Sequence, residues 1–179
     1  MAYVPRLLEW IPDDFSGSLL DVPIGTGLFT AAKYAGMGNA RITCLDYSSD
    51  MMAIAERRFA RAGIASVRFV QGDVGALPFE DDSFDMVLSM NGFHAFPDKE
   101  AAFRQTRRVL KPGGLLVGCF YVCGNVGRTD FCVNRFYVPM GHFTPPFMTQ
   151  AELDAKLRSM YAEVRLCNIG AIAYFRCVK

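Results

Sequence analysis

Residues 19–30 read Leu19-Leu20-Asp21-Val22-Pro23-Ile24-Gly25-Thr26-Gly27-Leu28-Phe29-Thr30 and decide the fold. An apolar run ends in an acid, a turn with two glycines follows, and a helical pattern begins after Gly27. Such a strand–turn–helix unit aims backbone N–H groups and a helix N-terminus at one point, which suits a nucleotide-like ligand. We therefore expect Gly25, Thr26 and Gly27 to form a ligand-binding turn. Pro23 stands where such turns often have their first glycine, and it lacks an N–H donor.

Strand-like and helix-like segments alternate along the rest of the chain, which is the pattern of a parallel sheet covered on both faces. The expected strands are residues 19–22, 41–45, 66–70, 84–89, 115–121, 163–168 and 171–178. The expected helices are residues 4–10, the stretch from Gly27 to Gly36, Ser48 or Ser49 to Gly63, residues 99–110, residues near 129–137, and a helix opened by the capping box Thr149–Glu152. Residues 111–114 are expected to form a turn. A two-residue turn at Ile169 and Gly170 makes the last two strands antiparallel. The fold class is therefore α/β, a Rossmann-like doubly wound sheet of seven strands, mostly parallel with an antiparallel last strand.

Composition narrows the class of protein. The chain has 179 residues, 51% of them apolar, so we expect one domain, residues 1–179, with a large core. The net charge of +1 gives no long-range attraction to nucleic acid or to an anionic membrane. Six cysteines form no disulfide framework, and Cys119 and Cys123 lack the spacing of a metal hook, so we expect reduced thiols and no metal. Without a signal peptide or a long apolar run, the expected location is the cytoplasm.

Residues 123–148 are irregular, with aromatic residues, three prolines and several glycines. A loop of this length is usually a binding lid or the wall of a pocket, so we interpret this segment as an insert that shapes a substrate pocket. The aromatic residues near it line either an apolar pocket or a small satellite core, and both alternatives stay open. These residues are Phe93, Phe96, Phe131, Phe136, Tyr137, Phe143 and Phe147.

Polar residues follow the first four expected strands. Asp21 ends the first strand, Asp46 the second, and Ser89 and Asn91 lie at the end of the fourth. Ligands of open α/β sheets collect at these carboxyl ends, near the point where the strand order reverses. The Asp46 carboxylate is placed to accept hydrogen bonds from a ribose diol. The alternative role for Asp46 is to cap the helix that follows it.

The third expected strand ends in Gly72-Asp73-Val74. Asp73 is suited to accept a hydrogen bond from the exocyclic amine of an adenine, with the Val74 N–H close to a ring nitrogen. Its alternative role is that of a turn-forming aspartate after Gly72. Tyr47 and Met51 are expected to flank the adenine ring, although Met51 is equally consistent with a core position.

One of the two histidines, His94, follows the fourth expected strand. It is our candidate general base, because an imidazole ordinarily titrates near neutral pH. A structural or substrate-contacting histidine is the alternative. His142, in the insert, has a weaker claim.

Five motifs together resemble a known family. They are Leu20-Asp21-Val22-Pro23-Ile24-Gly25-Thr26-Gly27, Leu45-Asp46-Tyr47-Ser48, Gln71-Gly72-Asp73-Val74 with Leu77-Pro78-Phe79, Ser83-Phe84-Asp85-Met86-Val87, and Arg108-Val109-Leu110-Lys111-Pro112-Gly113-Gly114. In this order they resemble class I S-adenosylmethionine-dependent methyltransferases, and the last group resembles the ubiquinone/menaquinone-biosynthesis-like branch. The resemblance implies a sheet of order 3-2-1-4-5-7-6, S-adenosyl-L-methionine as the cofactor, and a small-molecule acceptor. It implies methyl transfer mainly by proximity and alignment.

Other functions compete with methyl transfer. A nicotinamide-dependent oxidoreductase is one, but Thr30 stands where the fingerprint Gly-x-Gly-x-x-Gly has its third glycine. A second is a non-catalytic module that binds the cofactor, and a homodimer is possible in either case. Nucleic-acid methylation is weaker still, because no Asn/Asp-Pro-Pro-aromatic segment follows the fourth expected strand. The similar Pro145-Pro146-Phe147 comes too late in the chain. Relatives commonly carry further helices before the first strand, so we expect the lid to come from residues 123–148 or from a partner subunit, or to be absent.

Overall fold

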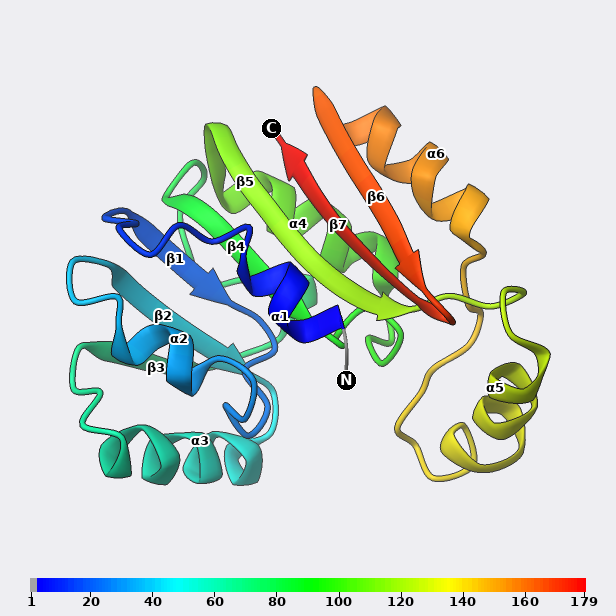
Figure 1. The fold of residues 1–179 in the computed structure, drawn as a ribbon, viewed down its shortest axis with the longest axis horizontal. Coiled ribbons are helices and arrows are strands. Elements are labelled where there is room, and N and C mark those ends of the chain that lie inside the picture. Colours follow the sequence, from blue (N-terminus) through cyan, green and yellow to red (C-terminus); the bar gives the residue numbers. More distant parts are fainter. Residues whose placement is uncertain (1–2) are drawn as a thin grey trace.

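The structure, a computed structural model, describes residues 3–179 and contains one seven-stranded sheet (Figure 1). The strand order is β3-β2-β1-β4-β5-β7-β6, which confirms the expected topology. The first five strands are parallel, and β7 is antiparallel to both β5 and β6. The strands are β1 (Ser18–Asp21), β2 (Arg41–Asp46), β3 (Val67–Gln71), β4 (Phe84–Met90), β5 (Leu110–Tyr121), β6 (Glu163–Ile169) and β7 (Ile172–Val178).

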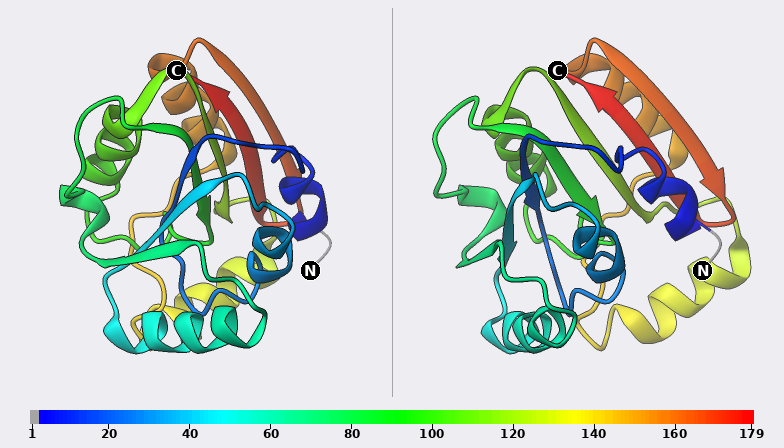
Figure 2. Two further views of the ribbon diagram at one scale, coloured as in Figure 1. Left: turned by 90° about the vertical axis from the view of Figure 1, so that its left-hand side faces the viewer. Right: turned by 60° about the vertical axis from the view of Figure 1, so that its left-hand side comes forward.

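Helices cover both faces of the sheet, and each face has its own apolar core. The helices are α1 (Tyr3–Leu8), α2 (Ala31–Ala35), α3 (Ser49–Arg61), the 3-10 turn η1 (Val74–Ala76), α4 (Lys99–Val109), α5 (Gly127–Cys132), the π-helix η2 (Val133–Tyr137) and α6 (Gln150–Met160). One core joins α1, α2 and α3 through Leu7, Tyr34 and Phe59. The other joins η1, α4 and α6, with Phe103 and Leu153 at its centre. Figure 2 shows α4 on the opposite side of the sheet from α1 and α2.

Local chemistry explains where the helices begin. The Ser48 side chain accepts a hydrogen bond from the Met51 N–H and caps α3. Thr149 and Glu152 form the expected capping box of α6. Among residues 3–179, no helix is long and apolar enough to cross a membrane.

Three expected boundaries are wrong. Residues 111–114 belong to β5, which begins at Leu110 rather than at residue 115. The pairing of β4 with β5 shifts register between Phe84 and Met86. Residues 111–114 lie within this irregularity of β5, and Gly113 adopts a positive φ there. The last hairpin turns at Gly170 and Ala171, one residue later than expected, because Gly170 adopts the positive φ that the turn requires. The helix α2 is also shorter than its pattern indicates, since it begins only at Ala31.

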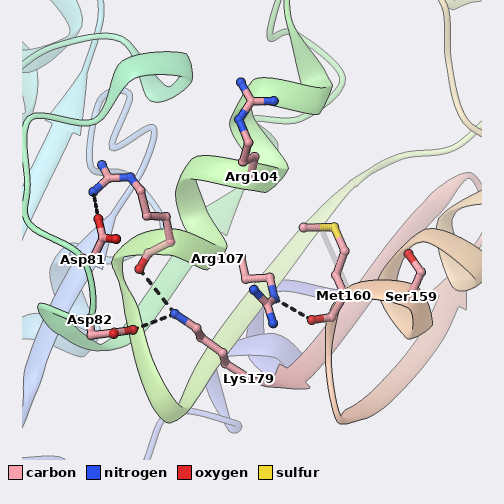
Figure 3. Close-up of a pocket in the computed structure, with 8 residues that line it drawn as sticks. Asp81, Asp82, Arg104, Arg107, Ser159, Met160 and Lys179 are labelled. Atoms are coloured by element: carbon pink, nitrogen blue, oxygen red, sulfur yellow. Dashed lines mark hydrogen bonds and ion pairs between the residues drawn. The ribbon is translucent and has the colours of Figure 1, made fainter.

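A hollow of about 570 Å³ lies at the amino ends of β4 and β5, away from the glycine turn (Figure 3). Arg108 pairs with Asp81 at 2.6 Å, and Lys179 pairs with Asp82 at 2.7 Å. Lys179 also donates to the carbonyl oxygens of Arg108 and Leu110. Lys179 therefore fastens the end of β7 to the start of β5, and we assign both cations a structural role.

Candidate functional site

A cavity of about 210 Å³ lies at the carboxyl end of β1. The end of β1, the following turn and the end of β4 surround it. Its lining residues are Asp21, Pro23, Ile24, Gly25, Thr26, Leu28, Phe29, Thr30, Met90 and Asn91. This set contains five of the residues expected from the sequence to bind the cofactor. The volume is below the 300 Å³ or so of a typical complete ligand site, so it suits one end of an extended ligand.

The two turn glycines have different neighbours. Both adopt positive φ, +53° at Gly25 and +65° at Gly27. A Cβ atom added to Gly25 would meet nothing within 4 Å, whereas one added to Gly27 would lie 2.6 Å from Cε1 of Phe59. Gly25 therefore keeps space open beside the cavity. Gly27 instead allows α3 to pack closely against the turn.

Asp46, at the end of β2, binds the turn directly. Its Oδ2 accepts a hydrogen bond from the Gly25 N–H at 2.7 Å, and its Oδ1 accepts one from the Ser48 N–H at 2.9 Å. A carboxylate has about four acceptor positions, so this arrangement leaves acceptor capacity for a diol. Asp46 thus holds the glycine turn against the start of α3, and the expected ribose contact remains compatible with the geometry.

Asp21 is a buried carboxyl group on the cavity wall, with 1% of its surface exposed. Its Oδ2 accepts a hydrogen bond from the Tyr34 hydroxyl at 2.7 Å. Burial raises the pKa of Asp21 to about 7, against the lowering effect of the Tyr34 hydrogen bond. Within the described range 3–179, no ion pair includes Asp21. The cavity therefore has an acid on its wall without a cation to balance it.

Thr30 is a cavity residue that the sequence did not reveal. It occupies the N-cap position of α2, but its side chain makes no capping hydrogen bond. Its hydroxyl oxygen is buried without a hydrogen bond of good geometry, and it lies close enough to the Asp21 carboxyl to lower the pKa of that group. A buried hydroxyl facing a cavity is a candidate ligand contact. The signal available in the sequence was a polar residue where the nucleotide fingerprint has its third glycine.

The expected adenine contacts lie beside the turn, at the ends of β2 and β3. Tyr47 is 78% exposed and Met51 43% exposed, so Met51 is not a core residue. Asp73 is exposed and caps η1, since its Oδ1 accepts a hydrogen bond from the Gly75 N–H at 2.8 Å. Val74 buries its side chain in the core. Gly72 donates its N–H to the Asp46 carbonyl oxygen and so joins the end of β3 to the end of β2.

Of the two site residues expected at the end of β4, Asn91 lines the cavity and Ser89 does not. Asn91 lines the cavity and adopts a φ of +55°. Ser89 is fully buried, is absent from the cavity lining, and lies beneath the turn. A Cβ atom on Gly92 would lie 2.4 Å from Cδ of Pro23 and 3.0 Å from Oγ of Ser89. Pro23 thus packs against the chain that follows β4.

His94 has a structural environment. Its Nδ1 accepts a hydrogen bond from the Tyr121 N–H at 3.2 Å, and its ring stacks on Phe143 with centroids 4.0 Å apart. Burial, aided by the charge of Lys99, lowers the pKa of His94 to about 4. The neutral ring therefore carries its proton on Nε2, and its one ring lone pair is already used. This geometry favours the structural alternative over a general base.

We expect acid to destabilise the protein through His94. Between about pH 4 and 6.5 the unfolded chain binds a proton at this position that the folded chain does not, so stability rises with pH across that window. Lowering the pH from 7 to 4.5 should cost roughly 2–3 kcal/mol through this group. In His94→Asn, urea unfolding at the two pH values should show this contribution removed. His142→Asn, at the exposed second histidine, is the control and should behave like the parent. Equal pH dependence in parent and His94→Asn would contradict the assignment.

The aromatic residues near the insert fall into three groups. Phe93 and Phe96 belong to a main core. Phe143 and Phe147 pack with Tyr121 and Val133 in a separate small core at the ends of β5 and β7. The satellite-core alternative is therefore correct for this second group. The third group, Phe131, Phe136 and Tyr137, is largely exposed.

A comparison with protein families places this geometry. A profile described as a methyltransferase domain matches residues 19–114, more than half of the chain. The chain belongs to the methyltransferase domain family. The match includes the glycine turn, Asp46, Asp73 and the whole of β4.

Relatives of known name or structure agree. The demethylmenaquinone methyltransferase of Staphylococcus aureus is 39% identical over 99 residues, which are 55% of this chain and 40% of that protein. This chain thus matches less than half the length of that relative. The YcgJ protein of Bacillus subtilis has a TM-score of 0.78 at 22% identity, over 93% of this chain and 70% of its own. A Thermotoga maritima S-adenosylmethionine-dependent methyltransferase, possibly a histamine N-methyltransferase, has a TM-score of 0.74 at 21% identity, over 99% and 89%. The two structures establish the shared fold.

S-adenosylmethionine is the cofactor that the family indicates, and the site fits it. The open space beside Gly25, the unbalanced Asp21 carboxyl and the buried Thr30 hydroxyl form a polar cradle for an amino-acid group. The exposed side chains of Tyr47 and Met51 offer apolar surface for a base. The residues present thus match both ends of this cofactor.

Proposed function

We propose that this protein transfers a methyl group from S-adenosylmethionine to a small-molecule acceptor. The observation that carries the proposal is the buried Asp21 carboxyl on the wall of the glycine-turn cavity, without an ion-pair partner in residues 3–179. A buried charge is costly unless it is balanced, so the cavity favours a ligand that brings a cation. S-adenosylmethionine carries both an ammonium and a sulfonium group.

The same carboxyl opposes a nicotinamide dinucleotide. In the dehydrogenase arrangement a pyrophosphate lies against the glycine turn, where it needs N–H donors and no negative charge. Here Asp21 lines the cavity, and Asp46 already accepts the Gly25 N–H. A pyrophosphate there would meet the Asp21 carboxyl and would lack the Gly25 N–H as a donor.

Each site residue then has a proposed role. Asp21, Thr30 and Asn91 bind the amino-acid end of the cofactor, while Gly25 and Thr26 leave room for it. Asp46 accepts from the ribose, and Asp73 with the Val74 N–H contacts the adenine between Tyr47 and Met51. When bound, the sulfonium supplies an activated methyl group. The protein aligns the acceptor with that group and excludes water.

The acceptor side is built by the insert, residues 123–148, within a single domain. The Thr144 N–H and hydroxyl donate to the carbonyl oxygens of His94 and Ala95, each at 2.9 Å. Lys99 donates to the Thr144 carbonyl oxygen. His94 is thus proposed as a residue that positions the insert.

The six free cysteines support a reducing, cytoplasmic location.

Calorimetric titration with S-adenosylhomocysteine, NADH and NADPH in parallel tests the cofactor. S-adenosylhomocysteine retains the ammonium group, so we expect it alone to bind saturably. Binding of NADH or NADPH instead would overturn the proposal. Transfer of a labelled methyl group to a panel of small acceptors then tests the activity itself.

Asp73→Asn tests the adenine contact separately from stability. Asparagine is as good a helix cap as aspartate, so the Gly75 N–H keeps its acceptor and the thermal midpoint should stay within about 2 °C. The asparagine has an NH2 group in place of one carboxylate oxygen, so an adenine amine loses an acceptor. This loss should weaken S-adenosylhomocysteine binding roughly tenfold. Asp50→Asn, an exposed acid in the first turn of α3, is the matched control and should bind like the parent. Unchanged affinity in Asp73→Asn would reduce Asp73 to a turn residue.

A further inference from the structure

The insert presents an exposed apolar surface. Phe131 is 65% exposed, Phe136 52%, Tyr137 45% and Met140 64%. They lie on and just beyond α5 and the π-helix η2, which project past the carboxyl end of β5 (Figure 1). Exposed apolar patches commonly mark interaction sites, and π-helical turns frequently occur at functional positions.

The same surface carries positive charge. Arg128 and Arg135 are both exposed, and with Phe131 they follow the three- and four-residue spacing of one helix face. The Arg135 guanidinium lies 5.7 Å from the centre of the Phe136 ring, so cation and aromatic ring form one continuous surface. We name Arg128, Phe131, Arg135, Phe136, Tyr137 and Met140 the outer face of the insert.

Among residues 3–179, the two arginines of the outer face form no ion pair. Asp130 is the single acidic residue of positions 123–148. Its Oδ1 accepts a hydrogen bond from the Tyr121 hydroxyl at 2.6 Å, and its Oδ2 accepts one from the Gly124 N–H at 3.0 Å. These two hydrogen bonds hold the Asp130 carboxylate against Tyr121 and Gly124.

The outer face is held in place. Val133 is buried in the small core beneath it, with Tyr121 and Ala171. The Cys123 N–H donates to the Met148 carbonyl oxygen at 2.9 Å and closes the base of the insert. The aromatic residues are therefore exposed on a folded scaffold.

We propose that the outer face of the insert docks the protein on an anionic lipid surface. Aromatic side chains with interleaved arginines are the composition of helices that lie in a membrane interface. The arginines complement anionic headgroups, and the rings enter the boundary with the acyl chains. A symmetric dimer through this face would bring two positively charged copies of the same surface together, which disfavours self-association. The net charge of +1 makes this attraction local. The proposal is independent of the proposed methyl transfer.

Sedimentation of the reduced full chain with vesicles tests the proposal. We expect binding to vesicles of phosphatidylcholine with phosphatidylglycerol, little binding to phosphatidylcholine alone, and loss of binding at high salt. The double variant Arg128→Gln with Arg135→Gln should lower the partition coefficient roughly tenfold or more. Phe131→Ser with Phe136→Ser should lower it by a similar factor. Circular dichroism melts check that both variants fold.

The matched control is Arg57→Gln with Arg61→Gln, two exposed arginines four residues apart on α3. It should bind vesicles like the parent. Absence of binding to anionic vesicles, equal binding to neutral ones, or equal loss in the control pair would each overturn the proposal. A dimer in sedimentation velocity that the phenylalanine variant dissociates would assign the outer face to a second copy and overturn it as well.

Discussion

Asp21→Asn is expected to make the ligand-free protein more stable at pH 8 and to abolish cofactor binding. The folded protein holds a proton on Asp21 up to about pH 7, whereas the unfolded chain loses it near 3.8. Parent stability therefore falls as the pH rises from about 4 to about 7, and the full penalty persists above that. Removing the charge should return roughly 2–4 kcal/mol at pH 8, or roughly 5–15 °C in the thermal midpoint. The Tyr34 hydroxyl keeps an acceptor, because the asparagine oxygen replaces the carboxyl oxygen.

Thermal melts of parent and Asp21→Asn at pH 5 and pH 8 measure this effect. The difference in stability between the two proteins should widen from pH 5 to pH 8, while calorimetry shows S-adenosylhomocysteine bound by the parent alone. His94 has the opposite effect on stability over nearly the same pH range, so the two groups partly cancel in the parent. In Asp21→Asn, the loss of stability at low pH that His94 causes should therefore be fully visible. Asp85→Asn, at a carboxyl whose pKa is near 2, is the control and should gain nothing at pH 8. A variant that is less stable than the parent at pH 8 would refute the unbalanced charge.

Gly27→Ala and Gly25→Ala are expected to fail in different ways. Both substitutions force alanine into positive φ, at a cost of roughly 1–2 kcal/mol. At Gly27 the new methyl group also meets Phe59 at 2.6 Å in a buried core, so the total loss should reach roughly 2–5 kcal/mol. At Gly25 the methyl group enters open space, so stability should fall by the backbone cost alone. The cofactor affinity of Gly25→Ala should nevertheless fall at least tenfold, or roughly 1.4 kcal/mol.

Urea unfolding and S-adenosylhomocysteine titration of the pair separate these effects. Gly63→Ala, a third glycine at positive φ with open space around it, is the control for the backbone cost and lies at the end of α3. It should lose stability as Gly25→Ala does and keep full affinity. Equal affinity in Gly25→Ala and Gly63→Ala would remove Gly25 from the site.

Sequence patterns among neighbouring residues were enough to predict most of the fold. The alternation of strand-like and helix-like segments located the seven strands, and capping residues at Ser48 or Ser49 and at Thr149 located two helix starts. The glycine turn and Asp46 were also evident, because both stand at strand ends where ligands collect. The start of β5 was not predictable, since Lys111-Pro112-Gly113-Gly114 has turn chemistry and becomes strand only through pairing with β4.

The chemistry of the site depended on contacts between distant residues. The burial of Asp21 depends on Tyr34 and the packing of α2. His94 looked like a base because the sequence could not show that the Tyr121 N–H, 27 positions away, donates to its ring. Thr30 was hidden because its role depends on a buried hydroxyl beside Asp21, and only the folded cavity brings the two together.

The small core beneath the insert is separate from the two cores that flank the sheet, and it rests on the ends of β5 and β7. The family match ends at residue 114, before this unit begins. We therefore expect substitutions within residues 123–148 to leave the strands that hold the glycine turn unaltered.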